Sequence, residues 1–235
     1  MLITNPERTR KIIEILLDCL KKVSILFLLL VPFVLDAYAH QPRLVMDLAS
    51  SDTDPILIEE PEVSKAYYGR LEKTPEYYAI SSNSEIDMYL SLQVPDLPNQ
   101  STNISLDLID KKGLILAHFE GKDHNWTRFH EDFGNADYLA GPSIRTTLPA
   151  GIYTIMISGD ENAKYVLVTG FEEKFPAPEF LNALVLVPKI NIEFFGMNAV
   201  QSMANIFGYM ILGFTAVIGF AILFTVRRIK RVKSK

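Results

Sequence analysis

Three histidines, His40, His124 and His130, have types and positions that could carry metal chemistry. A cut after the small-X-small triplet "AYA" at 37–39 would make His40 the first residue of the mature chain. An N-terminal histidine offers Cu(II) its α-amine and its imidazole, and Cu(II) favours such nitrogen and oxygen ligands in a tetragonal arrangement. His124 or His130 would complete the site. Copper is therefore one alternative for this chain, which is otherwise expected to need no cofactor.

The segment 123–142, "DHNWTRFHEDFGNADYLAGP", combines acidic and aromatic side chains. Its carboxylates could bind a hard cation, since such ions take oxygen ligands, or could simply make an acidic loop. Its aromatic residues predict a binding surface for a sugar or a partner protein, with burial as the small core of the loop as the alternative. The carboxylates are Glu131, Asp132 and Asp137, and the aromatic residues proposed as a surface are Trp126, Phe129 and Tyr138.

Other chemistry is limited to modification. Asn99, Asn103 and Asn125 each begin an N-x-S/T triplet and are candidates for glycosylation. The sequence has no G-x-S-x-G motif and no Gly-rich phosphate loop, and "HEDFG" lacks the second histidine of a zinc-protease helix. We therefore expect a protein that is not an enzyme.

The N-terminal segment has the layout of a secretory signal. A stretch that is positive overall precedes thirteen uncharged residues, 23–35, and the small-residue triplet follows them. Thirteen residues suit a signal h-region, whereas a membrane-spanning helix takes roughly 20. We interpret residues 1–39 as a signal peptide cleaved before His40, with an uncleaved anchor as the alternative.

The C-terminal segment predicts a membrane span. Residues 206–226 are uncharged and are followed at once by "RRIKRVKSK", which places the basic tail, 227–235, in the cytoplasm and the preceding domain outside. The expected location is the cell membrane, with a single pass through the lipid bilayer. The small-residue pairs Ala204/Gly208 and Thr215/Gly219 suggest a dimer through this helix.

Charge is distributed unevenly. The whole chain has 28 acids and 23 bases; residues 1–39 hold four acids and five bases, and the tail holds six bases. The part between them keeps 24 acids and 12 bases, a net charge near -12. This acidity argues against nucleic acid or an anionic membrane surface as the partner. The same part of the chain lacks cysteine, so its core must form by burial of apolar side chains, without disulfide bonds.

The domain from 40 to 171 has the two-residue periodicity of β-strands. In "IDMYLSLQV", 86–94, apolar and polar residues alternate, which is typical of a half-buried strand. "DKKG" and "LPAG" predict hairpin turns, and residues 123–142 predict a loop that caps one end. Short strands at this spacing predict two packed antiparallel sheets. Strands are expected at 43–48, 56–59, 65–71, 76–81, 86–94, 103–109, 114–120, 143–148, 151–158 and 163–169.

Residues 172–205 differ in character. Two prolines, Pro176 and Pro178, precede an apolar stretch that contains Pro188, Lys189 and Glu193. We interpret this segment as a linker followed by an amphipathic helix at the bilayer surface, with Phe194 and Phe195 near the interface. The alternative is that the helix packs against the β-domain.

Several of these segments resemble the pre-peptidase C-terminal-like domain of bacteria and archaea. The resemblance covers residues 76–170 and rests on "EYYAISSNSEIDMYLSL", "ISLDLIDKKGLILAHFEG" and "TTLPAGIYTIMISGDENAKYVLVTG". It implies an antiparallel jelly-roll-like β-sandwich with an accessory, non-catalytic role. Segment 123–142 departs from the family pattern. Periplasmic copper carriers are similar in their N-terminal histidine and their "LPAG-x-Y" turn.

The expectation for the whole chain is a mainly β ectodomain plus one C-terminal transmembrane helix. Its predicted function is that of a membrane-anchored surface protein that binds a protein or glycan partner or serves as an envelope component. Extracytoplasmic copper binding through His40 is the alternative.

Overall fold

The computed structural model describes residues 40–72 and 75–233, together with scattered helical positions between Glu7 and Lys22. The predicted cleavage site and the apolar run before it lie outside the described residues. Residues 38–206 form one compact unit, and the segment from Phe207 onward belongs to a second. The segment 172–205 is therefore part of the same compact unit as the β-strands.

Eleven strands are described, and they form a six-stranded and a five-stranded sheet. The six-stranded sheet has the order β1-β3-β11-β5-β9-β8, and the five-stranded sheet has the order β2-β4-β10-β6-β7. The strands are β1 (Gln41–Leu44), β2 (Ile56–Leu57), β3 (Lys65–Arg70), β4 (Glu76–Ser82), β5 (Ile86–Pro95), β6 (Ile104–Asp110), β7 (Ile115–Glu120), β8 (Thr127–Glu131), β9 (Ala136–Leu148), β10 (Gly151–Gly159) and β11 (Lys164–Thr169).

Both sheets are mixed, which corrects the antiparallel prediction. β1 pairs in parallel with β3, and β2 pairs in parallel with β4; the other pairs are antiparallel. From β1 to β5 the chain alternates between the two sheets. β1 is therefore connected to its neighbour β3 through β2, and β2 is connected to its neighbour β4 through β3. Two successive reversals restore the strand direction, and this makes the two pairs parallel.

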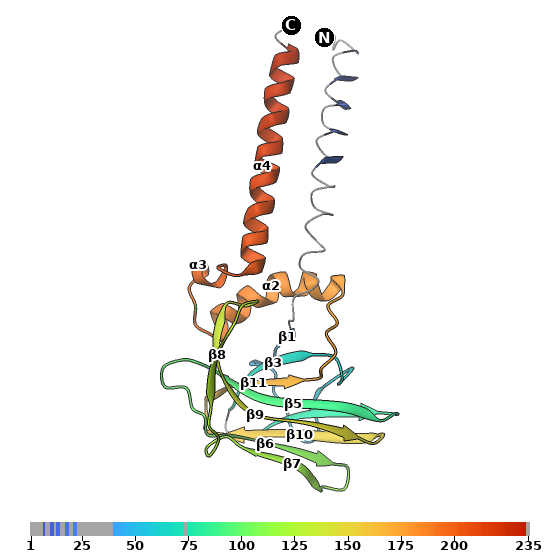
Figure 1. Ribbon diagram of the computed structural model, residues 1–235, viewed down its shortest axis with the longest axis vertical. Helices are drawn as coiled ribbons and strands as arrows, with labels where there is room; N and C mark the ends of the chain where they lie inside the picture. Colours follow the sequence, from blue (N-terminus) through green and yellow to red (C-terminus); the bar gives the residue numbers. More distant parts are fainter. Residues whose placement is uncertain are drawn as a thin grey trace. The chain divides into compact units, whose positions relative to one another are not determined.

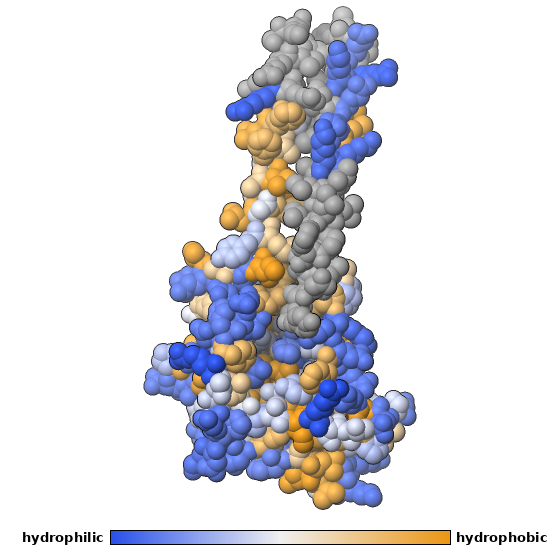
Figure 2. Space-filling view, viewed as in Figure 1, coloured by the Kyte–Doolittle hydropathy of each residue, from blue (hydrophilic) through white to orange (hydrophobic). Residues whose placement is uncertain are grey.

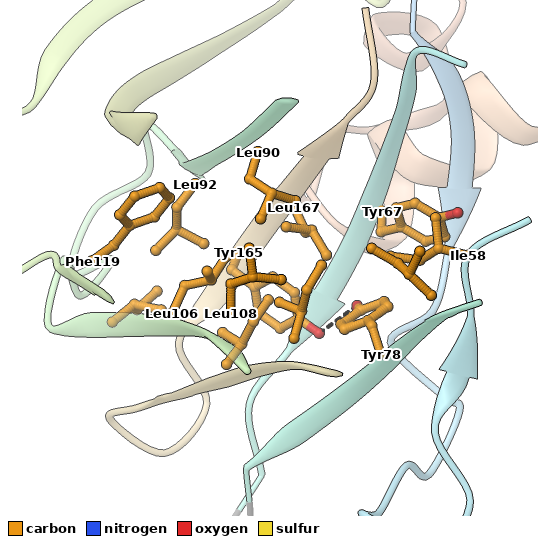
Figure 3. Close-up of a cluster of buried hydrophobic side chains, with 14 of the residues drawn as sticks. Ile58, Tyr67, Tyr78, Leu90, Leu92, Leu106, Leu108, Phe119, Tyr165 and Leu167 are labelled. Carbon is orange, nitrogen blue, oxygen red and sulfur yellow. Dashed lines mark hydrogen bonds between the residues drawn. The ribbon is translucent and has the colours of Figure 1, made fainter. Parts of the chain in front are cut away.

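The main core fills the space between the sheets. β5 alternates as predicted, and Ile86, Met88, Leu90, Leu92 and Val94 are all buried. They pack with apolar residues of the five-stranded sheet, including Leu106 and Leu108 on β6 (Figure 3). The period of two directs one side of each strand to this core. The molecule thus has a mainly β domain of two sheets packed face to face.

The two predicted hairpin turns have different outcomes. "DKKG" joins β6 to its antiparallel partner β7, with Gly113 at a positive φ of 83° and the carboxylate of Asp110 accepting from the backbone N–H groups of Lys112 and Leu114. "LPAG" instead links β9 in one sheet to β10 in the other, so the hairpin prediction there is wrong. The hydroxyl of Tyr153 donates to the carbonyl of Pro149 (2.8 Å), and this bond stabilises the connection between β9 and β10.

The predicted capping loop, 123–142, is a hairpin. β8 pairs antiparallel with the first part of β9, from Ala136 to Ala140. The carboxylate of Glu131 accepts from the N–H groups of Phe133 and Gly134, which closes the turn between the strands. The loop prediction is wrong because the polar residues of β8 give no clear alternation. Pairing with β9, rather than local pattern, determines this strand.

Three helices follow the strands: α2 (Ala177–Glu193), α3 (Ala199–Ser202) and α4 (Ile206–Lys233). Figure 1 shows α2 on the outer side of the six-stranded sheet, with the five-stranded sheet beyond it. α2 therefore packs on the β-domain, as the alternative prediction stated. Phe194 and Phe195 are buried in this contact, so their predicted position at the bilayer interface is wrong.

α4 contains the predicted membrane span. Over 206–227 it is long and apolar enough to cross a bilayer, and it is the sole such helix among the described residues. The helix continues through the basic residues to Lys233 instead of ending at 226. Ala204 lies before the first residue of α4, so Ala204 and Gly208 are not on one helix face. Of the two small-residue pairs predicted to pack in a dimer, only Thr215/Gly219 lies within the helix.

Candidate functional site

One enclosed feature that the structure describes lies between α2 and the outer face of the six-stranded sheet. Ile190, Phe194 and Phe195 from the helix region pack against Val166 and Val168 of β11. The alternate residues of β11, Tyr165 and Leu167, face the core between the sheets. β11 is thus buried on both faces. The continuous apolar run "YVLV" was the signal for this second layer, because a strand covered on one side would alternate.

A cavity of about 80 Å³ remains in this interface. It has room for a few water molecules, whereas sites for small-molecule ligands usually measure about 300–1,000 Å³. Its lining brings together several residues that the sequence analysis singled out, among them His40, Phe129, Glu131 and Tyr138. They meet here because β1, β3, β5, β8, β9 and β11 all contribute to the sheet beneath α2.

The polar groups around the cavity have partners within the protein. The hydroxyls of Tyr68 and Tyr138 are 3.1 Å apart, and the side-chain amide of Asn191 donates to the carbonyl of Gly134 (2.8 Å). Nδ1 of His40 is hydrogen-bonded to Oγ of Ser64. These bonds join the strands to one another and to α2. Buried polar groups satisfied in this way stabilise one arrangement of the layers.

Burial sets the ionisation of these groups. It lowers the pKa of His40, because the interior disfavours the imidazolium. It raises the pKa of Glu131, and the two N–H groups of the β8–β9 turn partly oppose that shift. Burial also raises the pKa of the Tyr68 and Tyr138 phenols, so both remain neutral donors and acceptors. His40 is therefore neutral near pH 7.

The structure does not bring together the three histidines of the copper hypothesis. His40 precedes β1, at one edge of the six-stranded sheet, and His130 is on β8, at the other edge. His130 lies on the face of β8 opposite to Phe129 and Glu131, and its Nδ1 is 2.9 Å from a carboxylate oxygen of Asp137. His124 stands edge-on to Trp126, at 6.0 Å between ring centroids.

No group of three metal-ligating side chains is assembled among the described residues. The carboxylates of the β8–β9 hairpin do not converge either, because Glu131 binds the turn amides and Asp132 is exposed to solvent. Copper binding stays a prediction from the sequence. It would require the His40 amine to be freed by cleavage and a second ligand to approach it.

The predicted aromatic surface is divided between the two cores. Phe129 stacks on Tyr138 at 5.2 Å, and Tyr138 contacts Phe195 edge-on beneath α2. Trp126 packs against the core between the sheets, and its indole N–H donates to the carbonyl of Gly121 (2.7 Å). A Cβ at Gly141 would lie 2.6 Å from the same indole ring, so only glycine fits there. The three residues do not form one exposed surface; burial, the alternative prediction, describes them better.

The three glycosylation candidates are all exposed, but they differ in their surroundings. Asn99 lies in a turn with φ +63°, and Asn125 lies just before β8. The side-chain amide of Asn103 donates to a carboxylate oxygen of Asp160 (2.7 Å), so a glycan at this position would break that bond. Asn99 and Asn125 are the more accessible acceptors.

One feature that the sequence analysis missed is the attachment of α2 to the edge strand β1. The guanidinium of Arg43 donates to both carboxylate oxygens of Glu179, at 2.8 and 2.9 Å, and its Nη2 also donates to the side chain of Gln41. The amide of Gln41 donates to the carbonyl of Lys174 (2.7 Å). These residues are far apart in the sequence, and nothing in their local pattern indicates the pairing.

Comparisons with known proteins place the chain in no family. No family model matches it, and no curated protein does. Among solved structures, the pre-peptidase C-terminal domain of a collagenase from Bacillus anthracis aligns with 57% of this chain and 98% of its own length, at 9% identity and a TM-score of 0.30. The catalytic domain of a GH87 α-1,3-glucanase, in complex with nigerose, aligns with 46% of this chain, at 14% identity and a TM-score of 0.24. This chain covers 22% of that second structure.

Proposed function

We propose that this chain is a non-enzymatic, membrane-anchored surface protein whose acidic β-domain lies outside the cytoplasm and binds a protein partner. The observation that carries the proposal is α4, a helix long and apolar enough to span a bilayer, which follows the β-domain, α2 and α3 in the chain. The jelly-roll-like arrangement and the relationship to pre-peptidase C-terminal-like domains belong to the same proposal.

The distribution of charge supports the orientation. Six basic residues follow the apolar part of α4, and basic residues next to a span favour the cytoplasmic side. The β-domain on the other side is acidic, and its described residues contain no cysteine to be oxidised there.

The non-enzymatic role is supported by what the titratable side chains already do. Glu131 binds the N–H groups of a turn, His118 is 2.6 Å from a carboxylate oxygen of Asp107, and His130 is paired with Asp137. The cavity beneath α2 is small for an organic substrate. These groups stabilise strands and turns, and no nucleophile and base need to be assumed among them.

The surface that we propose for the partner is the edge strand β7 of the five-stranded sheet. Ile115 is 53% exposed, and its chain neighbours Leu114 and Leu116 are exposed as well. Figure 2 shows hydrophobic surface at the tip of the domain where Figure 1 has the turn from β6 to β7. An edge strand offers unpaired backbone N–H and C=O groups, and another strand can add to it.

Anchoring and orientation can be tested on the full chain in cells. In a Cys19→Ser background, a cysteine at Asn125 in the β-domain should react with a membrane-impermeant maleimide in intact cells. A cysteine at Ser234 should react only after the membrane is opened. Alkaline carbonate should leave the protein in the membrane fraction. Labelling of residue 125 only after lysis, or release by carbonate, would contradict the proposal.

A further inference from the structure

α2 presents an apolar stripe on the side that faces away from the sheet. Leu181, Val185 and Ile192 are 62%, 73% and 45% exposed, and the half-buried Leu184 and Pro188 lie in the same stripe. The five positions follow the i, i+3, i+4, i+7 and i+11 spacing of a single helix face. We call these five residues the outer stripe.

The inner face of the same helix is already filled. Ala183, Val187, Ile190 and Asn191 are buried, and Ile190 packs on the sheet together with Phe194 and Phe195 just after the helix. A helix that is apolar on both sides is normally covered on both sides, in a protein core or by lipid. The sheet covers one side of α2, and the outer stripe is left without a cover among the described residues.

The residues just before α4 are hydrogen-bonded to the β-domain and to α2. The side-chain amide of Asn191 donates to the carbonyls of Gly134 (2.8 Å) and Ser202 (3.4 Å), and Asn135 donates to the carbonyl of Ala204 (2.7 Å). The side-chain amide of Asn205 donates to the carbonyl of Ser202 (2.7 Å). Residues 202–205 are thus bonded to the β-domain and to the C-terminal end of α2, and α4 begins at the next residue, Ile206.

We propose that the outer stripe, together with Val200 on α3, lies in the interfacial layer of the lipid bilayer, so that the β-domain rests directly on the membrane. The inference rests on the proposed anchoring by α4. If the chain enters the bilayer at Ile206, then the surface bonded to residues 202–205 must be at the membrane. Val200, which is 82% exposed, is on α3, the short helix between α2 and α4 in the chain.

The lipid contact is apolar and not electrostatic. Lys189 and Glu193, which flank the outer stripe, are 3.7 Å apart as an ion pair, so this side of the helix has little net charge. Burial of apolar side chains at the depth of the headgroups would hold such a helix without anionic lipid. An acidic domain can therefore rest on a bilayer by this stripe.

The test uses the full chain with Cys19→Ser, reconstituted into vesicles of phosphatidylcholine alone. An environment-sensitive fluorophore is attached to a cysteine at Val185 or, as the matched control, at Ile152, an exposed apolar residue of the five-stranded sheet. We expect the label at 185 to emit at shorter wavelength, to be quenched by nitroxide-labelled lipid and to be protected from iodide. The label at 152 should be quenched by iodide and not by the lipid.

A further variant checks that the stripe acts as a unit. Leu181→Asp with Leu184→Asp should give the label at 185 several-fold stronger quenching by iodide, while the unfolding midpoint of the domain stays unchanged. Equal access of iodide to 185 and 152, in a protein that floats with the vesicles, would overturn this inference and leave the anchoring intact. A protein that does not float with the vesicles would overturn both. Protection at 185 that disappears when each vesicle holds one chain would assign the stripe to a second copy of the chain and overturn the lipid contact.

Discussion

Arg43 on β1 and Glu179 in the first turn of α2 form a two-bond ion pair across 136 positions of the sequence. Both side chains are about three-quarters buried, at 27% and 23% exposure. The pair ties the first strand of the β-domain to α2, which covers the six-stranded sheet. α2 is thus fixed at its start by Arg43 and near its end by Asn191.

Removal of this pair should loosen α2. We expect Arg43→Ala to lower the free energy of unfolding by about 1–3 kcal/mol, because it leaves the partly buried Glu179 carboxylate without its two charged donors. Urea unfolding of the full chain in detergent would measure this loss. Arg128→Ala is the matched control, since Arg128 pairs with Asp96 but is 72% exposed, and its loss should be smaller. Equal losses for the two variants would refute the role of the Arg43 pair.

Two buried tyrosines link the sheets. The hydroxyls of Tyr78 on β4 and Tyr165 on β11 are 2.7 Å apart in the core (Figure 3). Tyr78→Phe should cost about 1–3 kcal/mol of unfolding free energy, because the Tyr165 hydroxyl is left buried without its partner. Adding Tyr165→Phe should recover part of that loss. A double variant that is no more stable than Tyr78→Phe alone would contradict this account. The same urea titration measures all three proteins.

His40 should make the domain less stable in mild acid. Burial lowers its pKa in the folded protein, so below the unfolded value of about 6.5 the unfolded chain binds more protons. The contribution of neutral His40 is therefore fully present above pH 6.5 and is lost as pH falls through the lower folded value. Thermal unfolding of wild type and His40→Gln between pH 7.5 and 5 would show it as a steeper loss in the wild type.

The contribution of His40 to the pH dependence of stability can be separated from that of other titrating groups. Glu131 and Glu76 have raised pKa values, since burial disfavours their carboxylates, and they change stability in the opposite direction. The difference between wild type and His40→Gln cancels their contribution. Parallel curves for wild type and His40→Gln would mean that His40 is solvated in the folded protein.

The edge strand β7 should be the site of partner contact. A photo-crosslinking amino acid at Leu116 should give a discrete adduct in cells that express the full chain. The same group at Leu57, on the opposite edge strand of the same sheet, should not, although Leu57 is exposed. Replacement of Ile115 by Lys should remove the adduct at 116 without lowering the unfolding midpoint. An adduct of the same size from both positions would speak against a specific edge.

Local patterns in the sequence predicted most strands and the long apolar helix α4. β5 illustrates this, because alternation along 86–94 already separates the buried from the exposed side chains. The apolar stretch of α4 is recognised from its length and its lack of charged residues. Both features are periodic or compositional, so neighbouring residues are enough to reveal them.

Segment 123–142 shows where local patterns fail. The polar strand β8 exists because β9 pairs with it. Tyr138 is buried and Phe129 is half-buried because α2, more than 35 residues later, packs over them. Neither fact is encoded in the spacing of nearby residues. The candidate site residues were identified one by one from the sequence, but their grouping depended on which strands became neighbours.

The periodicity of the strands, the turn at Gly113 and the apolar stretch of α4 follow from the amino-acid sequence alone, because each arises from residues close together in the chain. Three features became visible in the folded protein alone: the mixed sheets, the positions of His40 and His130 at opposite edges of the six-stranded sheet, and the packing of α2 on that sheet. These depend on pairings such as that of Arg43 with Glu179. Long-range contacts of this kind are set by the burial and hydrogen bonding of whole layers, and no single segment specifies them.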